Sequence, residues 1–439
     1  MRTGLKLQDF DSIFFTIDYE PNYVNAIQIL LKTGIEPLAS KRVRPIIIGG
    51  GAAVSSNPYP LRPFFDILAI GESEVIMPEI VEHVENFDIE AFNGKIWAVT
   101  QHKREAKRVY LSSLSESQSA SAFYYSQATF KMNLVEVSRS CPNRCRFCLL
   151  SYNSLPPRWL PVRRFKELIR SFPDHHDLGL VGGSVLDHPE IDELIKMSYR
   201  FKTINPSSIK IDPKTERILI LLKQKGLESI TIAPETGSDN LREKLNKKIK
   251  NDEILDFVHV VSKLKFNSLK LYFMLGVPYE EDQDIEAINI LLSDLSRIFK
   301  GHIEVTFSIF VPKPHTPFQY YPIVAKGDYL RKKKLLKIPK RIRADFGSYN
   351  GAVRQLLFSR GDEEMGYKII NELKGEKLDA LLNTEKYLYD ESFVKSLPFN
   401  LVDSGVKPDF LKREEMFAKN RKTTPKCNPG TCRICGICS

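Results

Sequence analysis

Residues 136–148 read EVSRSCPNRCRFC and place cysteines at positions 141, 145 and 148, directly after the strand-like run Asn133–Val137. Three thiolates in this C-x3-C-x2-C spacing can ligate three irons of a cubane cluster, so the fourth iron is left open for another ligand. The alternative is a zinc loop, but structural zinc needs four closed ligands and typically uses C-x2-C pairs.

The region around this loop has a repeating pattern. Between residues 132 and 311, short apolar runs recur at Asn133–Val137, Leu178–Val181, Ser208–Ile211, Ser229–Ile232, Leu269–Leu275 and Glu304–Phe310. Helix-length segments separate them, and Ile254–Leu264 has apolar residues at i, i+3, i+4 and i+7. This alternation predicts parallel βα units. Crossover handedness would curve six units into an open (β/α)6 partial TIM barrel with its site at the C-terminal strand ends.

Together, the cysteine loop and the βα pattern resemble the radical S-adenosylmethionine (SAM) superfamily. The resemblance implies an enzyme whose [4Fe-4S] cluster, on Cys141, Cys145 and Cys148, cleaves SAM reductively to a 5′-deoxyadenosyl radical that abstracts hydrogen from an unactivated carbon. The residue before the third cysteine is usually aromatic in this superfamily and lies near the adenine, which Phe147 fits. Arg144 and Arg146 add positive charge, which we expect to stabilise the reduced cluster.

The same resemblance implies SAM contacts after later strands. They are Gly182, Gly183 and Ser184 near the methionine amino group, Glu235 and Ser238 near the ribose and carboxylate, and the backbone of Val311 near the adenine. A structural turn is the alternative for the glycines, and helix capping is the alternative for Glu235 and Ser238. Asp212 and Lys270, on the predicted third and fifth strands, could point into the barrel.

A narrower resemblance rests on TIAPETGS (231–238), FVPKPHTPFQ (310–319) and SRGD (359–362). These segments are similar to an uncharacterised branch of the superfamily whose tail ends in clustered cysteines. Within the second segment, His315 could serve substrate or proton transfer. We favour a packed loop histidine, since no partner for it can be identified in the sequence.

Residues 1–90 predict a small, half Rossmann-like α/β domain, from the runs Ser12–Thr16, Pro45–Ile48 and Asp66–Ile70. They resemble the second half of a cobalamin-binding domain. No histidine precedes His83, so the usual lower axial ligand is absent. Some members of the superfamily bind cobalamin without this histidine, so cobalamin binding stays open as an alternative. We favour a vestigial domain that covers the barrel mouth or contacts substrate. Polar residues 91–128 predict a linker.

After the core barrel, expected at 129–324, residues 325–405 predict a charged helical accessory region. The tail, 406–439, has the spacing C-x4-C-x2-C-x2-C at Cys427, Cys432, Cys435 and Cys438. Four thiolates could hold an auxiliary [4Fe-4S] cluster, but Cys-x-x-Cys-Gly also occurs in zinc knuckles, and an unmetallated tail is a third alternative. All seven cysteines fall in these two groups, which favours metal ligation over disulfides.

Composition bears on location and partners. Lys plus Arg is 64 and Asp plus Glu is 54, so the formal charge is +10, and this excess favours encounter with polyanions such as RNA. The basic run at 332–343 is either a solvated face or a nucleic-acid surface. No apolar run reaches the roughly 18 residues of a membrane span, and residues 1–10 lack a secretory signal, so we expect a cytoplasmic protein.

For the substrate, the sequence favours a macromolecule such as RNA, with a flavodoxin or ferredoxin type of electron donor. The reaction subclass, transferase or oxidoreductase-type C–H modification, and the oligomeric state stay open. One alternative is a cobalamin-assisted C-methyltransferase that acts on a lipid or peptide. The other is a non-catalytic Fe-S or zinc scaffold that binds nucleic acid.

Overall fold

The computed structural model describes residues 4–438 except 85, 87, 122–129, 175, 208, 213–214 and 376–384. The chain forms two compact units, each made of three segments. The N-terminal unit comprises Met1–Ser112, Val311–Ile323 and Asn350–Leu411, and the barrel unit comprises Ser113–Phe310, Val324–Tyr349 and Lys412–Ser439. The division differs from the sequence boundaries, because segments after the barrel return to the N-terminal unit without a change in composition.

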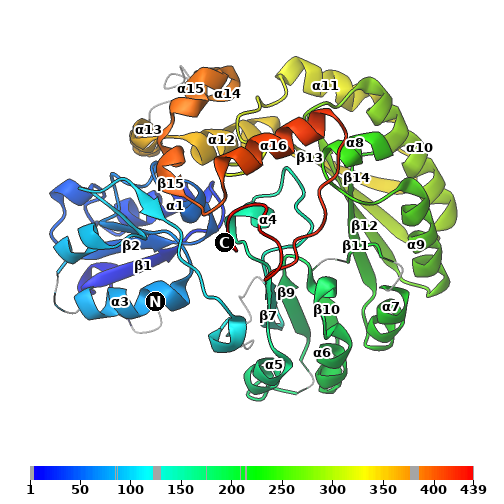
Figure 1. Cartoon of the computed structure of the whole chain (residues 1–439), viewed down its shortest axis with the longest axis horizontal. Helices are drawn as coiled ribbons and strands as arrows, with labels where there is room; N and C mark the ends of the chain where they lie inside the picture. The colour runs from blue at the N-terminus through cyan, green and yellow to red at the C-terminus, as the bar shows by residue number, and fades with distance from the viewer. Residues whose placement is uncertain are drawn as a thin grey trace. The chain divides into compact units, whose positions relative to one another are not determined.

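The barrel unit holds two sheets (Figure 1). In the first, β7 (Asn133–Arg139), β9 (Leu178–Gly182) and β10 (Ile204–Pro206) are parallel, and the short strands β6 (Ala120–Ser121) and β8 (Arg158–Trp159) pair antiparallel with β7. The second sheet is parallel throughout, in the order β11 (Ser229–Glu235), β12 (Ser268–Leu275), β13 (His302–Ile309) and β14 (Ile342–Phe346). Over the described residues, the sheets do not close into a barrel, which confirms the expected open α/β architecture.

Helices cover the outer side of these sheets. They are α5 (Val162–Ile169), α6 (Ile191–Met197), α7 (Thr215–Gln224), α9 (Asn251–Lys263) and α10 (Asp282–Ile298) (Figure 1). Alternate residues of β12, such as Leu269, Leu271 and Phe273, are buried, whereas Lys270 and Tyr272 between them are exposed. Each fully buried side chain of this kind stabilises the fold by roughly 1.5–3 kcal/mol. The core therefore lies between strands and helices, and the inner sheet face keeps its polar residues.

Two strands differ from expectation. The third strand, β10, lies at 204–206, and the predicted run at 209–211 forms no strand, while residue 208 lies outside the described part. Pro206 weakens the strand signal, yet it is tolerated because β10 is an edge strand. β14 falls in the region predicted to be helical, because its charged alternate residues resemble a helix surface.

Several residues of the basic run serve as structural contacts. On α11 (Lys326–Leu335), the ammonium of Lys332 is buried against Glu280 at 2.9 Å, and that of Lys333 lies 4.0 Å from the ring centre of Phe346. Arg341 donates to the backbone carbonyl of Ser296 at 2.7 Å. These contacts favour a structural role over a nucleic-acid surface for this segment.

The N-terminal unit is built on a four-stranded sheet in which β1 (Ser12–Thr16), β2 (Ile46–Gly50) and β3 (Ile67–Ala69) are parallel and β4 (Ala98–Thr100) is antiparallel. Helices α1 (Asn22–Lys32) and α3 (Ser73–Val84) follow the first and third strands. β4 lies within the predicted linker, and Trp97 beside it is buried in the core with Ile46 and Ile67. The linker prediction is wrong at this point, since a three-residue strand is too short to recognise in a polar segment.

The later segments of this unit are mainly helical, with α12 (Tyr349–Arg360), α13 (Glu363–Leu373), α14 (Glu385–Tyr389) and α15 (Glu391–Ser396). The short strand β15 (Val402–Asp403) pairs with β5 (Ala106–Lys107) of the first segment. His315 is buried, and its ring contacts the carbonyl of Ser56 at 3.0 Å. Burial lowers its pKa to about 4, which confirms a packed loop histidine.

Among helices of the described residues, none has the length and apolarity to cross a bilayer.

Candidate cofactor site

The cysteine loop runs from the end of β7 to α4 (Leu150–Asn153) and is sharply bent. Ser140 and Arg144 adopt left-handed backbone conformations, with φ of 68° and 57°. Such conformations cost about 1–3 kcal/mol each and persist where surrounding contacts hold them. Here the Asn246 side-chain amide donates to the Arg144 carbonyl at 3.0 Å, and the Tyr152 hydroxyl donates to the same carbonyl at 3.2 Å.

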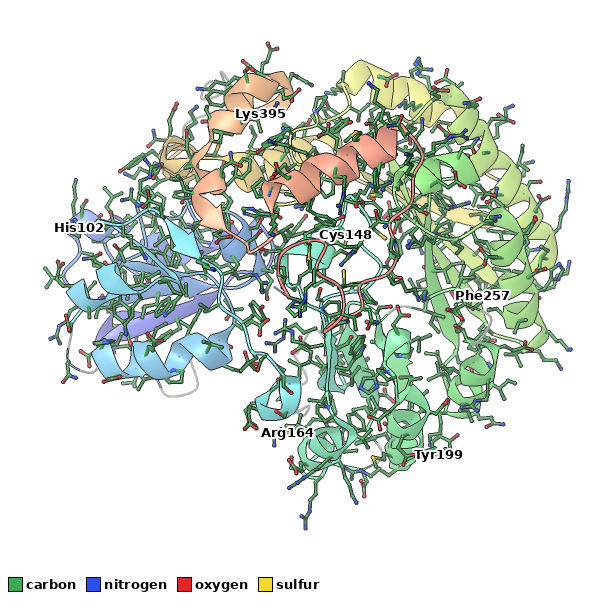
Figure 2. All side chains as sticks on the ribbon, viewed as in Figure 1. His102, Cys148, Arg164, Tyr199, Phe257 and Lys395 are labelled. Atoms are coloured by element: carbon green, nitrogen blue, oxygen red, sulfur yellow. The ribbon has the colours of Figure 1, made fainter. Side chains whose placement is uncertain are left out.

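This bend directs all three loop cysteines toward one cavity of about 370 Å³, a size typical of small-molecule sites. Figure 2 labels Cys148 on this loop. The cavity lining includes Cys141, Cys145, Phe147, Cys148, Gly183, Ser184, Lys210, Asp212, Glu235, Lys247 and Lys426. Strand-end residues thus meet the loop as expected for parallel βα units. In the described ranges, no three His, Cys, Asp or Glu residues form a group that could hold a single metal ion.

Glycine is required where the turn after β9 meets the cysteine loop. A Cβ added at Gly183 would lie 2.5 Å from the carbonyl oxygen of Ser140, the residue before the first cysteine. Gly182 packs instead against Ser138, where a Cβ would lie 2.1 Å from the hydroxyl, and it does not line the cavity. Gly183 and Ser184 are therefore placed at the site, whereas Gly182 serves strand packing.

Glu235 forms a charged pair inside the cavity. It ends β11 with φ of 68°, and its carboxylate lies 3.2 Å from the ammonium of Lys247. Burial raises the pKa of Glu235, and the facing ammonium partly offsets that effect. Burial disfavours the charged form of Lys247, but Glu235 and the Cys145 thiol outweigh it and raise its pKa. Sequence reasoning missed Lys247, whose basic neighbours Lys248 and Lys250 offered only a weak signal.

Other predicted residues have different surroundings. Ser238 caps α8 (Asp239–Lys244), with its hydroxyl accepting from the Leu241 amide at 3.1 Å, and it does not line the cavity. The structure shows the capping alternative, and a contact of Ser238 with SAM stays a prediction. Asp212 lines the cavity, whereas Lys270 lines a separate one. Val311 belongs to the N-terminal unit, and its contact with the adenine stays a prediction.

Asp187, in the short helix η5 (Val185–Asp187), connects four segments around the cavity. One carboxylate oxygen accepts from Lys210 at 3.0 Å and Lys426 at 3.1 Å, and the other accepts from Asn143 at 3.1 Å and Ser184 at 2.6 Å. Burial would raise its pKa, but these donors outweigh burial and hold the pKa at about 2. No sequence signal identifies this residue, because three of its four partners come from distant segments.

The tail cysteines begin beside the first cysteine loop. The Cys427 amide donates to the Pro142 carbonyl at 2.8 Å, and the Arg144 guanidinium donates to the Cys432 sulfur at 3.1 Å. Burial opposes the thiolate of Cys432, but backbone donors and Arg144 outweigh it and lower its pKa. Arg146, in contrast, pairs with Glu414. Its charge is compensated there, so the expectation that it stabilises a reduced cluster loses its basis.

Comparison with known proteins identifies the family. Residues 1–111 match the family described as radical SAM proteins, N-terminal, and residues 135–291 match the radical SAM superfamily. A curated but uncharacterised protein of Methanocaldococcus jannaschii is 32% identical, over 82% of this chain and 80% of its own length. The chain belongs to the radical SAM superfamily. It is therefore an enzyme of the class that uses a [4Fe-4S] cluster and SAM.

Two further matches are more distant in sequence. The tRNA-2-methylthio-N(6)-dimethylallyladenosine synthase of Ehrlichia canis is 20% identical, over 80% of this chain and 74% of its own. Among solved structures, the apo form of the cobalamin-dependent SAM radical enzyme OxsB matches with a TM-score of 0.48 and 13% identity, covering 64% of this chain and 43% of that enzyme.

Proposed function

We propose that this radical SAM enzyme ligates its cluster through Cys141, Cys145 and Cys148 and binds SAM in the adjoining cavity. One observation carries the proposal, namely that the three cysteines share a single cavity with Phe147, Gly183, Ser184 and Glu235. The donor set fits, since three thiols leave one iron of a cubane open. When bound, the cluster supplies the electron that cleaves SAM to methionine and a 5′-deoxyadenosyl radical for C–H activation.

The chain's own residues bind and orient the reactants. Gly183 permits the close approach of backbone to the methionine group, and Phe147 offers an apolar face to the adenine. Lys247 places a positive charge near Cys145, which suits an anionic thiolate cluster. The partly enclosed cavity limits water around a reactive radical, which is the protein's main task in such cofactor chemistry.

For the substrate we propose a macromolecule, RNA in the first instance, with a flavodoxin or ferredoxin type of protein as electron donor. The formal charge of +10 supports a polyanionic substrate. The distant relative whose name assigns it to tRNA modification points to the same class. Mass spectrometry of total RNA nucleosides, in cells with and without the gene, tests this. Loss of a modified nucleoside supports RNA, and a change confined to lipids or peptides contradicts it.

The tail cysteines are proposed to hold a second metal centre, an auxiliary [4Fe-4S] cluster or zinc, on Cys427, Cys432, Cys435 and Cys438, which would have to draw their thiols closer together than the structure places them. The lowered pKa of Cys432 supports this, because metals bind thiolates. Iron, zinc and sulfide analysis of the anaerobically purified chain separates the two metals.

The decisive test of function compares two cysteine substitutions. The reconstituted wild-type chain, with dithionite and saturating SAM under anaerobic conditions, should release 5′-deoxyadenosine. Cys148→Ala should abolish this product, whereas Cys435→Ala should retain it at saturating SAM. A fully reconstituted wild-type chain that yields none would contradict the proposal and favour the scaffold. Cobalamin absorption in the purified chain would support the methyltransferase alternative.

A further inference from the structure

One side chain of the cysteine loop contacts the sulfur of a loop cysteine. Asn143 lies between Cys141 and Cys145, and its side-chain amide nitrogen is 3.3 Å from the Cys141 sulfur and 3.1 Å from a carboxylate oxygen of Asp187. An Asn amide has two N–H donors, so each partner can accept one hydrogen bond. An ionised carboxylate and an iron-bound thiolate both act only as acceptors, so the donor end of the amide suits both at once.

Contacts that do not involve sulfur fix the position of Asn143. Its backbone carbonyl accepts from the Asn246 side-chain amide at 3.2 Å. The carboxylate of Asp187 is 14% exposed, and it is held in turn by the Lys210 ammonium at 3.0 Å and the Ser184 hydroxyl at 2.6 Å. The amide therefore faces the thiol because of the packing around it, and it needs no reorganisation when charge develops on the sulfur.

A donor in this position bears on how readily a cluster accepts an electron. Hydrogen bonds to the sulfurs are among the factors that set the reduction potential of an Fe-S cluster. Reduction adds one negative charge, part of which lies on the ligand sulfurs, so an N–H donor stabilises the reduced state more than the oxidised state. Cys141 is only 8% exposed, and in such a poorly solvated place the hydrogen bond is stronger than it would be in water.

We propose that Asn143, oriented by Asp187, donates a hydrogen bond to the cluster ligand Cys141 and thereby raises the reduction potential of the cluster that cleaves SAM. The inference rests on the proposed function, since it needs Cys141 as a ligand of iron. With this hydrogen bond in place, an electron donor of given potential keeps a larger fraction of the enzyme in the reduced state.

The test is an anaerobic redox titration of the full-length, reconstituted chain without SAM, followed by electron paramagnetic resonance. The signal that Cys148→Ala lacks identifies the first cluster. Asn143→Leu removes both donors at similar size. At a fixed potential it should lower the ratio of reduced to oxidised cluster about ten-fold, which is about 59 mV for a one-electron couple. Asn143→Asp has the same shape but adds a negative charge, so it should lower the potential further.

The matched control is Asn420→Leu, which makes the same change at an exposed site where the amide donates to the Met416 carbonyl at 3.0 Å. This variant should keep the wild-type potential. A wild-type potential in either Asn143 variant that retains its iron, or loss of iron from both, would overturn the inference. A reduced-cluster signal that persists unchanged in Cys148→Ala would instead contradict the proposed function.

Discussion

Arg146 and Glu414 form a salt bridge at 3.1 Å in which neither side chain is exposed. Arg146 lies between the second and third cysteines of the loop, and Glu414 lies on α16 (Pro408–Lys419). The guanidinium also donates to the carbonyls of Glu243, Lys244 and Lys422 at 2.6–3.1 Å. These contacts connect the cysteine loop to α16 and to the segment that follows α16 toward the tail.

Replacing Arg146 tests this anchor. Arg146→Met should destabilise the barrel unit by about 3–5 kcal/mol, because it leaves the Glu414 carboxylate buried without its partner. Denaturant unfolding of the full chain measures the loss. The matched control is Arg163→Met, which breaks an exposed pair with Glu167 and should leave the midpoint unchanged. Equal midpoints for the two variants would show that the buried pair contributes nothing.

A methyl group at Gly183 should displace the cysteine loop. The added carbon of Gly183→Ala would meet the Ser140 carbonyl at 2.5 Å, and backbone cannot move aside as a side chain can. We expect a lower iron content at the first site after reconstitution, measured by iron analysis and electron paramagnetic resonance. Gly327→Ala, on α11 with no atom within 4 Å of the new carbon, is the control and should keep the wild-type iron content.

The Glu235 and Lys247 pair should show coupling in a double-mutant cycle. Each single change, Glu235→Gln or Lys247→Met, leaves one partly buried charge without its partner and should destabilise the chain by about 1–3 kcal/mol. The double variant should lose less than the sum of the two, because no uncompensated charge remains. Strictly additive losses in urea unfolding would argue against an interaction between the two side chains.

Because His315 is buried, the stability of the folded chain should depend on pH. Its pKa is lowered from 6.5 to about 4 in the folded chain, so below pH 6.5 the unfolded chain binds the extra proton first. Stability from this group is complete above pH 6.5 and falls by up to about 3 kcal/mol as the pH drops toward 4.

His315→Gln should flatten the slope of stability against pH between 6.5 and 4 in the N-terminal unit. Replacing the exposed His302 by Gln is the control and should keep the wild-type slope. An unchanged slope in His315→Gln would mean that this histidine is not held neutral by burial.

Much of the fold could be predicted from local sequence patterns. The spacing of Cys141, Cys145 and Cys148 pointed to the superfamily, and apolar alternation located five of the six barrel strands within a few residues. Both signals are local in sequence, since ligand spacing and side-chain period act over fewer than about ten residues. Where the local signal was weak, as at β10, β14 and β4, the prediction failed.

The spacing of the cysteines was enough to predict the kind of chemistry, because three closely spaced thiolates can leave one iron open wherever the loop lies. The surroundings of that loop, in contrast, follow from the packing of the folded chain. Asp187, Lys247, Lys426 and Glu414 come to the surroundings of this loop from distant segments. Arg144 of the loop and its partner Cys432 are 288 residues apart in the chain. Such partners meet through packing of the barrel unit, and no local pattern encodes which distant charge will face which cysteine.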